Sequence, residues 1–533
     1  MTTKRLLTLF LTTAVALAAQ SGVTYQTIPL PRSIQMAPGN DCFLLVKGQG
    51  VSCPAGNQQM LRNAWFAQEY LGLTPQAGKK GKPAMQLLLG LQSNNPDAYT
   101  IDIGKKGIII RGASEIGVFH AIQTLRKSIS GEQGDTISLP FATIKDEPRF
   151  AYRGVHLDCA RHFFPVEFIK TYIDILALHG VNQFHWHLTD DQGWRFEVKS
   201  LPELAKQASY RPHTILGRNV GLDDSSNTLF DDTPEEGFYT QEQIRDIVAY
   251  AAERYINIIP EIDLPGHMVA ALSVYPELGC TGGPYSVWCQ WGVSADVLCA
   301  GNPKTLDFLK TVFGELCEVF PSKYIHIGGD ESPRYRWQHC PKCQAKMKEL
   351  GLEKEAQLQT YINKEMERFL AERGRELIGW DETLEGGLSE NAIVMSWRGY
   401  QGGIDAARQH HRVIMTPTSH CYIDYYQLKN TNAQPLGIGG YVPVSKVYGM
   451  EPVPRELTKE ESRYIMGVQC NLWTEYVVSP DHATYMLLPR LAAMSEVQWL
   501  LPQAKDYQSF LQRLPTLLQM YRSLGYKYCT SVE

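Results

Sequence analysis

The sequence has no block of five or six like charges, and its acidic and basic residues nearly balance. It contains 51 lysines and arginines against 56 aspartates and glutamates, which gives a net charge of −5 at pH 7. A nucleic-acid-binding protein typically carries a basic patch and a high pI, whereas the pI of this chain is near 6.3. We therefore expect that nucleic acid is not a partner.

The composition of disordered proteins and the long apolar runs of membrane proteins are also missing. Glycine and proline together account for about 14% of the 533 residues, well below the share that indicates disorder. After the first twenty residues, no uninterrupted apolar stretch approaches the roughly 20 residues that a membrane helix requires. We expect a well-packed soluble protein with two to four folding units, or one large barrel plus a smaller unit.

The start of the chain has a character of its own. Lys4 and Arg5 precede an apolar run from Leu6 to Ala18, which ends in the small residues typical of a cleavage site. The run of about 13 residues is too short for a membrane span, the alternative interpretation. We expect residues 1–19 to be a signal peptide and the mature protein to be exported to the periplasm, the cell surface or the medium, with no transmembrane segment left.

Cysteine is scarce, with 12 residues in the chain. This is too few for a disulfide scaffold, although export would permit disulfides. Cys340 and Cys343 form a C-x-x-C motif, but no second such motif or histidine pair follows within about 20 residues, so a zinc ribbon is not expected. Disulfides that staple loops, or buried thiols, are the two interpretations that the sequence favours.

Residues 20–148 have the pattern of a small α+β domain. Strands are predicted at 43–46, 85–91, 99–103 and 108–111, the last two joined by a hairpin turn at Gly104-Lys105-Lys106-Gly107. Apolar residues at helical spacing predict helices around 61–70 and 116–125. Because the histidines and acids of this segment are scattered, we expect a structural role for it.

Residues 149–533 change to short apolar strands that alternate with helical segments, the pattern of βα units around a parallel sheet. A final helix is predicted near 507–524. Eight such strands over this length favour a TIM (β/α)8 barrel over a doubly wound open sheet, the competing α/β fold. The predicted strands are 154–157, 182–188, 256–262, 324–327, 376–379, 392–396, 413–416 and 466–469.

Chemically capable side chains follow the ends of these strands. In a barrel, the carboxyl ends of the strands form the face that carries the active site. If these residues were only solvated loop acids and edge aromatics, they would be as frequent at the amino ends of the strands. The chain has few of them there. The residues are Asp158, Arg161, His162, Asp190, Asp191, Asp263, His267, Asp330, Glu331, Trp380, Asp381, Trp397, Tyr422, Asp424, Trp473 and Glu475.

The sharpest local signal is Asp330-Glu331, two adjacent acids that follow a strand and two glycines. Adjacent carboxylates repel, so we expect one of them to keep its proton near neutral pH, as a general acid must. Three tryptophans, Trp380, Trp397 and Trp473, come from other strand ends. Indole rings stack on the C–H faces of sugars, so acids and tryptophans together predict a carbohydrate site.

The histidines raise the alternative of a metal-dependent hydrolase on a barrel. His185 and His187 lie two residues apart and would present both rings on one face of the second strand. Metallohydrolase barrels place such a pair on the first strand, and no bridging lysine is suitably placed here. We therefore expect packed, hydrogen-bonded histidines, with neither a metal ion nor another cofactor at the catalytic site.

Five segments stand out in order along the chain: 152–163 (YRGVHLDCARHF), 185–192 (HWHLTDDQ), 261–267 (EIDLPGH), 328–331 (GGDE) and 471–475 (NLWTE). Together they closely resemble glycoside hydrolase family 20, the β-N-acetylhexosaminidases. The resemblance covers nearly all of the mature chain, and the family's architecture, a small α+β domain ahead of a catalytic barrel, is the one predicted above. It implies an exo-acting, retaining enzyme that removes terminal β-linked GlcNAc or GalNAc from oligosaccharides or glycoconjugates, with the 2-acetamido group of the substrate as nucleophile.

The resemblance also implies roles for individual residues. Glu331 would be the general acid and base, and Asp330 would orient the acetamido N–H and offset positive charge. Tyr422 would donate to the acetamido oxygen, and Asp190 with His267 would tune Glu331. Arg161, Asp424 and Glu475 would hold sugar hydroxyls, and Trp380, Trp397 and Trp473 would enclose the sugar. An inactive carbohydrate-binding protein on the same scaffold is the other class, and it would be expected to lack Glu331 or Asp330.

Overall fold

The computed structural model describes residues 25–77, 82–128, 134–218 and 229–533. The predicted signal peptide, residues 1–19, lies outside the described residues. Within these ranges, no helix combines the length and the apolar character that crossing a membrane requires.

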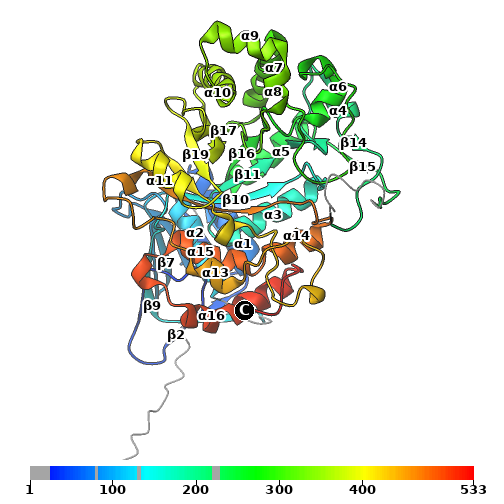
Figure 1. The fold of residues 1–533 in the computed structure, drawn as a ribbon. Coiled ribbons are helices and arrows are strands. Elements are labelled where there is room, and N and C mark those ends of the chain that lie inside the picture. The colour runs from blue at the N-terminus through cyan, green and yellow to red at the C-terminus, as the bar shows by residue number, and fades with distance from the viewer. Residues whose placement is uncertain (1–24, 78–81, 129–133, 219–228) are drawn as a thin grey trace, which may run out of the picture.

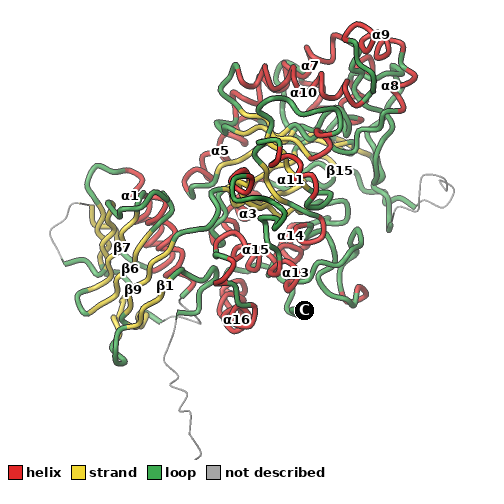
Figure 2. Tube along the Cα trace, turned by 60° about the vertical axis from the view of Figure 1, so that its left-hand side comes forward, coloured by secondary structure: helices red, strands yellow, loops and turns green. Residues whose placement is uncertain are grey.

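The N-terminal domain is built on one mixed sheet. Its seven strands lie in the order β1-β9-β6-β7-β5-β3-β4, and β2 pairs with β8 in a separate ribbon. Figure 2 shows this sheet beside the barrel, with α1 next to it. The strands are β1 Ser33–Met36, β2 Cys42–Val46, β3 Gly50–Cys53, β4 Thr74–Ala77, β5 Met85–Leu89, β6 Tyr99–Gly104, β7 Gly107–Gly112, β8 Thr136–Pro140 and β9 Ala142–Asp146.

Two helices of this domain, α1 (Gln58–Leu71) and α2 (Glu115–Lys127), pack against each other and against the sheet. Each begins at a residue whose side chain satisfies a free backbone N–H of the first turn: the Asn57 side chain accepts from the N–H of Met60, and Ser114 from Ile116. The two-residue turn between β6 and β7 falls at the predicted hairpin, where Gly107 has a positive φ of 127°.

The second domain is a closed barrel of eight parallel strands, which confirms the predicted TIM barrel. Their order around the barrel follows the chain, and β21 pairs with β10 to close the ring. All eight predicted segments are strands. They are β10 Tyr152–Asp158, β11 Gln183–His187, β16 Asn257–Glu261, β17 Tyr324–His326, β18 Glu376–Trp380, β19 Ile393–Ser396, β20 Val413–Met415 and β21 Ile465–Leu472.

Helices and short ribbons surround the barrel (Figure 1). Two-stranded ribbons are formed by β12 (Thr189–Asp190) with β13 (Gly193–Trp194) and by β14 (Tyr210–Arg211) with β15 (Glu235–Glu236). The helices are α3 Val166–Leu178, α4 Pro202–Gln207, α5 Gln241–Glu253, α6 Val269–Val274, α7 Pro303–Val319, α8 Tyr335–His339, α9 Pro341–Leu350, α10 Ala356–Ala371, α11 Gln401–Arg408, α12 Thr418–Cys421, α13 Val444–Gly449, α14 Pro480–Leu487, α15 Arg490–Trp499 and α16 Tyr507–Ser523.

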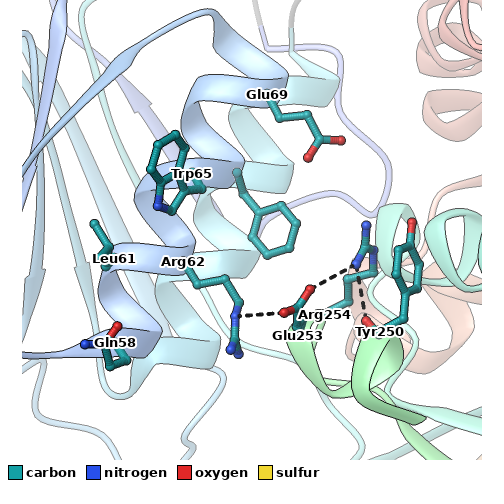
Figure 3. A pocket seen from close by; sticks show the side chains of 9 residues that line it. Gln58, Leu61, Arg62, Trp65, Glu69, Tyr250, Glu253 and Arg254 are labelled. Atoms are coloured by element: carbon teal, nitrogen blue, oxygen red, sulfur yellow. Dashed lines mark hydrogen bonds and ion pairs between the residues drawn. The ribbon is translucent and has the colours of Figure 1, made fainter. Parts of the chain in front are cut away.

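The two domains are joined by buried polar contacts. Trp499 at the end of α15 donates its indole N–H to both carboxylate oxygens of Asp146, each at 3.0 Å. An open pocket lies between α1 and α5, where Arg62 pairs with Glu253 at 3.8 Å (Figure 3). The predicted C-terminal helix is α16, anchored by a buried ion pair from Arg513 to Glu496 at 2.6 Å. These contacts hold the N-terminal domain and α16 against the barrel.

Candidate active site

The carboxyl ends of the barrel strands bring the predicted chemical residues to one face. Asp158 ends β10, Asp190 follows β11, and Trp380 ends β18. Arg161 and His162 follow β10, Asp191 follows β11, Asp381 follows β18, and the others lie in the loops that follow β16, β17, β19, β20 and β21. A large part of the constellation is buried, including Asp190, His267, Asp330, Tyr422, Asp424 and Trp473.

The Asp330-Glu331 pair depends on the two glycines before it. Gly328 and Gly329 have positive φ values of 65° and 100°. A Cβ atom at Gly328 would lie 1.8 Å from Oδ1 of Asp263, the same oxygen that accepts the Gly329 N–H at 2.9 Å. Glu331 itself has a φ of 42°, a region that non-glycine residues rarely adopt outside functional sites. The backbone therefore turns sharply here to present both carboxyl groups.

His267 lies between the acids of two loops. Its Nδ1 is 3.0 Å from Oδ1 of Asp190 and 3.5 Å from Oδ2 of Asp191. Its Nε2 is 3.6 Å from Oε2 of Glu331 and 3.8 Å from Oδ2 of Asp330. The structure thus places Asp190, His267 and Glu331 in a continuous chain of charged contacts.

These contacts determine the charges of His267 and Glu331. Burial disfavours a charged ring, but Asp190 and the hydrogen bonds around the imidazole raise the pKa of His267 well above its ordinary value. The charged ring of His267, whose Nε2 lies 3.6 Å from Oε2 of Glu331, lowers the pKa of Glu331. Glu331 is therefore ionised beside a histidine cation in the free protein.

Asp330, the other of the adjacent acids, belongs to a second buried pair. Burial raises the pKa of Asp330, and the charge of Glu331 adds to this effect. Burial and the charge of Asp330 raise the pKa of Asp263 well above its usual range. Asp263 and Asp330 thus form a buried pair that favours sharing one proton.

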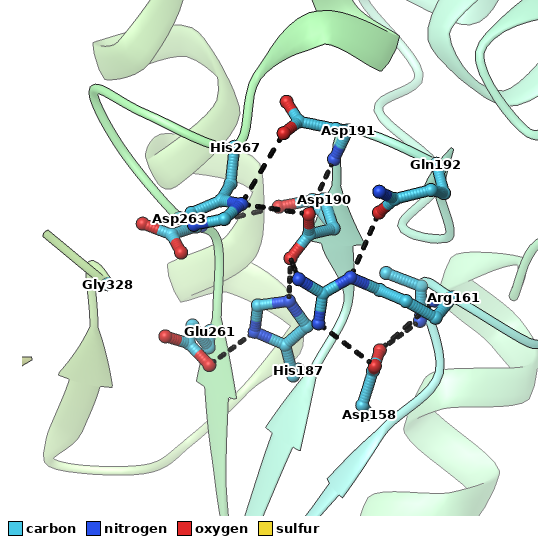
Figure 4. Close-up of polar contacts among 12 residues, drawn as sticks. Asp158, Arg161, His187, Asp190, Asp191, Gln192, Glu261, Asp263, His267 and Gly328 are labelled. Atoms are coloured by element: carbon cyan, nitrogen blue, oxygen red, sulfur yellow. Dashed lines mark hydrogen bonds and ion pairs between the residues drawn. The ribbon is translucent and has the colours of Figure 1, made fainter. Parts of the chain in front are cut away.

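Arg161 contacts four groups near the carboxyl ends of β10 and β11, and Figure 4 shows three of them, Asp158, Asp190 and Gln192. Its guanidinium contacts Asp158 at 3.2 Å and Asp190 at 3.0 Å, and its Nε donates to Gln192 at 2.9 Å. The Cζ atom lies 5.2 Å from the centre of the Trp473 ring. Although burial opposes the charge, these acids raise the pKa of Arg161 well above its ordinary value. A fixed cation therefore faces the site.

Beneath Asp190, a buried carboxylate gathers the strand histidines. Glu261 is 2.5 Å from Nδ1 of His187, 3.1 Å from His185 and 2.9 Å from His326, and it accepts the indole N–H of Trp380 at 2.9 Å. Despite burial, Glu261 and Asp190 raise the pKa of His187 to about 10. The pair predicted on one strand face, His185 and His187, thus lies around one carboxylate, with one ring nitrogen of each histidine within 3.1 Å of Glu261.

The aromatic residues form a connected wall. The Trp380 and Trp473 rings lie 5.9 Å apart, and Trp397 stacks on Tyr422 with ring centres 6.0 Å apart. The Trp397 indole donates to Glu382 at 2.9 Å, which fixes its orientation. The structure therefore brings the three predicted tryptophans together with Tyr422 in one cluster.

Asp424 and Glu475 complete the polar part of the site. Burial raises the pKa of both carboxyl groups, and the charge of Glu475 raises that of Asp424 further. Within the described part of the chain, Oδ1 of Asp424 and Oδ1 of Asp330 are buried without a hydrogen-bond partner. Such atoms are available to bind polar groups of a ligand.

Five residues of this network were not assigned roles from the sequence. Asp191 and Asp263 are among the predicted strand-end residues, but the sequence alone assigns no specific role to either. Glu382 lies two positions after Trp380. Glu261 and His187 contact each other inside the barrel, and Glu261 also contacts His185 and His326. No local sequence pattern reveals which interior side chains meet across strands. The set is His187, Asp191, Glu261, Asp263 and Glu382.

The cysteines correct one expectation. No second C-x-x-C follows Cys340 and Cys343, but the fold brings Cys280 and Cys299 to them, with ligand atoms of all four within 4.8 Å of one another. The spacing argument against a four-cysteine site was wrong because the missing pair precedes the motif and is brought to it by a long loop. Of the cysteines described, none lies at disulfide distance from another, so the structure shows no loop-stapling disulfide.

Comparisons with known proteins match this geometry. The family model "Glycosyl hydrolase family 20, catalytic domain" matches residues 150–501, and "Glycosyl hydrolase family 20, domain 2" matches residues 24–147. A β-hexosaminidase of Porphyromonas gingivalis is 41% identical over 91% of this chain, and the chain spans 62% of that relative's length. A β-hexosaminidase of Vibrio furnissii is 36% identical over 90% of this chain and 77% of its own.

Solved structures agree in fold. The exo-β-N-acetylglucosaminidase of Vibrio harveyi, solved with N-acetylglucosamine, superposes with a TM-score of 0.82 at 31% identity, covering 95% of this chain and 78% of that one. The β-N-acetylhexosaminidase of Streptomyces coelicolor has a TM-score of 0.80 at 29% identity, covering 95% and 98%. The family model matches most of the chain, and the five segments that resemble the family in sequence lie at the strand ends. The chain therefore belongs to glycosyl hydrolase family 20.

Proposed function

We propose that this chain is an exo-acting β-N-acetylhexosaminidase that removes terminal non-reducing β-linked GlcNAc or GalNAc from oligosaccharides or glycoconjugates. The observation that supports this most is the Asp330-Glu331 pair, joined through His267 to a buried charge network on the barrel face that also carries the cluster of three tryptophans and Tyr422. Both acids are present, which argues against an inactive carbohydrate-binding protein.

Substrate binding follows from the fixed charges. Arg161 is held by Asp158 and Asp190, so it can donate to sugar hydroxyls without losing side-chain freedom on binding. Oδ1 of Asp424, which has no partner within the described residues, can accept from the same hydroxyls. Glu475 lies close enough to Arg161 for their charges to interact. These three groups would hold the terminal sugar, while the tryptophans stack on its apolar faces.

The first chemical step needs no nucleophile from the enzyme. The acetamido oxygen attacks the anomeric carbon, the glycosidic C–O bond breaks, and Glu331 gives a proton to the departing oxygen. Asp330, which shares one proton with Asp263 in a buried pair, would accept the acetamido N–H and offset positive charge on the cyclised ring. Tyr422 would donate its hydroxyl proton to the acetamido oxygen.

The second step returns the enzyme to its starting state. Glu331 takes a proton from a water molecule that attacks the anomeric carbon, and the ring C–O bond to the acetamido oxygen breaks. Because each step inverts the anomeric carbon, the product keeps the β configuration. Glu331 is half-exposed in the free enzyme, so a bound sugar that excludes water raises its pKa and favours the protonated form that the first step requires.

Export remains part of the proposal. The basic residues Lys4 and Arg5, the apolar run and the small residues before position 20 support a signal peptide. A terminal-sugar hydrolase outside the cytoplasm would act on glycans at or beyond the cell surface.

A side-by-side assay of chromogenic β-GlcNAc, β-GalNAc and β-glucose glycosides tests the proposed activity. We expect release from one or both N-acetylated sugars and release orders of magnitude slower from the β-glucoside, because only the acetamido group supplies the nucleophile. The anomeric proton of the first product, observed by NMR, should be that of the β anomer. Equal rates on all three glycosides, or an α product, would contradict the proposal.

A further inference from the structure

Four cysteine side chains converge outside the catalytic network. Cys280 and Cys299 come from the long loop between α6 and α7, and Cys340 and Cys343 come from the start of α9. The Sγ–Sγ distances are 3.8 Å for Cys280–Cys343, 3.7 Å for Cys299–Cys340 and 3.6 Å for Cys299–Cys343. Cys299, Cys340 and Cys343 are buried, and Cys280 is half-buried.

We propose that these four cysteines bind one structural zinc ion. A tetrahedral ion with zinc–sulfur bonds of about 2.3 Å has sulfurs about 3.8 Å apart, and the three distances in the cluster match this spacing. A disulfide would need about 2.05 Å between two sulfurs. An iron–sulfur cluster, in which the cysteines bind different irons, would hold its thiolates farther apart.

The surroundings of the cluster suit thiolate ligands. Cys340 immediately precedes α9, and Cys343 lies in its first turn, where the positive end of the helix dipole favours negative charge. The backbone N–H of Gly301 hydrogen-bonds to the sulfurs of Cys299 and Cys343. Such N–H donors around a metal centre orient the ligands and offset part of their charge. With four protein ligands and no open position, the site is of the structural kind.

The backbone between the two pairs is shaped for close approach. A Cβ atom at Gly301 would lie 2.1 Å from the carbonyl oxygen of Lys342 and 2.5 Å from the nitrogen of Cys343, so only glycine fits there. The Trp337 indole donates to the carbonyl of Leu298 at 2.9 Å and fixes the loop against α8. These contacts hold the two halves of the cluster together from different parts of the chain.

The site also connects two loops that carry the catalytic groups. The N–H of Leu298, next to Cys299, donates at 2.9 Å to the carbonyl of Pro265, two positions before His267. Cys340 lies on the same connection that begins with Asp330 and Glu331 after β17. A zinc ion would therefore cross-link the loop that supports His267 to the loop that presents the acids. Its role would be to stabilise both loops, without contact to the substrate.

The first test uses the purified full-length wild-type protein. Elemental analysis after gel filtration should find one zinc ion per chain, and thiol titration in denaturant with chelator should find all 12 cysteines reduced. Stoichiometric iron, or loss of four titratable thiols to disulfides with no bound metal, would overturn the proposal. So would protein that carries no metal and takes up none when the reduced chain is refolded with zinc.

Variants separate this cluster from cysteine chemistry in general. Cys343→Ser should lose most of the bound zinc, whereas Cys289→Ser should retain it, since Cys289 lies in the same loop as Cys280 and Cys299 but outside the cluster. Cys280→His should also retain zinc, because imidazole is a zinc ligand. Equal zinc contents in Cys343→Ser and Cys289→Ser would contradict the assignment.

Cobalt substitution gives a readout that does not depend on the variants folding. Wild-type protein refolded with Co²⁺ should show visible bands of the intensity typical of tetrahedral cobalt bound by thiolates. Weak octahedral bands would contradict a four-sulfur site. Because metal content and spectra do not depend on hydrolysis, failure of this proposal and failure of the proposed activity are distinguishable.

Discussion

Replacing Asp190 by asparagine removes one charge from the centre of the network and keeps the shape of the side chain. Asp190 contacts His267 at 3.0 Å, Arg161 at 3.0 Å and His187 at 2.9 Å (Figure 4). The substitution leaves these buried cations without their shared partner. Breaking a buried ion pair by removing one member typically costs about 3 to 5 kcal/mol of folding free energy.

The same change has a defined effect on the pH dependence of activity. The charge of Asp190 is the main reason that the pKa of His267 lies above its ordinary value, so in Asp190→Asn burial lowers that pKa. A neutral His267 no longer stabilises ionised Glu331, whose pKa then rises. Because the first step requires protonated Glu331, the basic limb of the kcat/KM profile should move to higher pH, together with a lower maximum.

Two assays check this prediction. Initial rates on an aryl β-GlcNAc from pH 4 to pH 9 give the kcat/KM profile, and urea unfolding gives the change in folding free energy. Asp191→Asn is the matched comparison, since Asp191 is also buried beside His267 but lies farther away, at 3.5 Å, and should give smaller changes in both. A basic limb that stays in place or moves to lower pH in Asp190→Asn would refute the reasoning.

The stability difference should itself depend on pH. Arg161 and His267 hold the pKa of Asp190 well below its ordinary value, although burial opposes them. Stability from a carboxyl group with a depressed pKa is present above the unfolded value of about 4 and is lost as the pH falls below it. The part of the difference that comes from Asp190 should therefore be full at pH 7 and at pH 5 and should shrink only in stronger acid. The part that comes from His267, whose pKa is raised in wild type and lowered by burial in Asp190→Asn, should grow as the pH falls from 7 to 5.

Two further substitutions test the acid and the turn that presents it. Glu331→Gln should lower turnover on natural oligosaccharides roughly a hundredfold or more, because the amide cannot donate the proton. The loss should be smaller on aryl glycosides, which have good leaving groups. Cleavage of the natural substrate at nearly the wild-type rate would show that Glu331 is not the general acid. Gly328→Ala should destabilise the fold more than Gly351→Ala, since both glycines have φ near 65° but only the first would place a Cβ against Asp263, at 1.8 Å. Equal unfolding midpoints for the two alanine variants would show that the contact with Asp263 is not the cause.

Much of the fold could be predicted because it is encoded in local patterns. The eight barrel strands are short apolar runs between helical segments, and each begins and ends within three residues of its predicted bounds. Several N-terminal strands were missed, including Gly50–Cys53 and Thr74–Ala77. Thr74–Ala77 contains Pro75, and neither strand has a clear alternating pattern, so they form through pairing within the sheet and not through their own propensity.

The site could be predicted less completely, for a physical reason. Side chains at strand ends, such as Asp190 and Glu331, are marked by their position after an apolar run. Contacts across the barrel interior are not, so the three histidines around Glu261 and the proton shared by Asp263 and Asp330 appear only in three dimensions. The meeting of Cys280 and Cys299 with Cys340 and Cys343 likewise depends on how a long loop folds.

The central claim is that the acetamido oxygen of the substrate is the nucleophile, and inhibition by a thiazoline derived from N-acetylglucosamine tests it most directly. This compound mimics the cyclised intermediate that Asp330 and Tyr422 would stabilise. We predict competitive inhibition, with an inhibition constant at least about a hundredfold below that of N-acetylglucosamine, because mimics of high-energy states bind more tightly than ground-state ligands. Binding no tighter than N-acetylglucosamine would contradict substrate assistance and would favour Asp330 as a nucleophile.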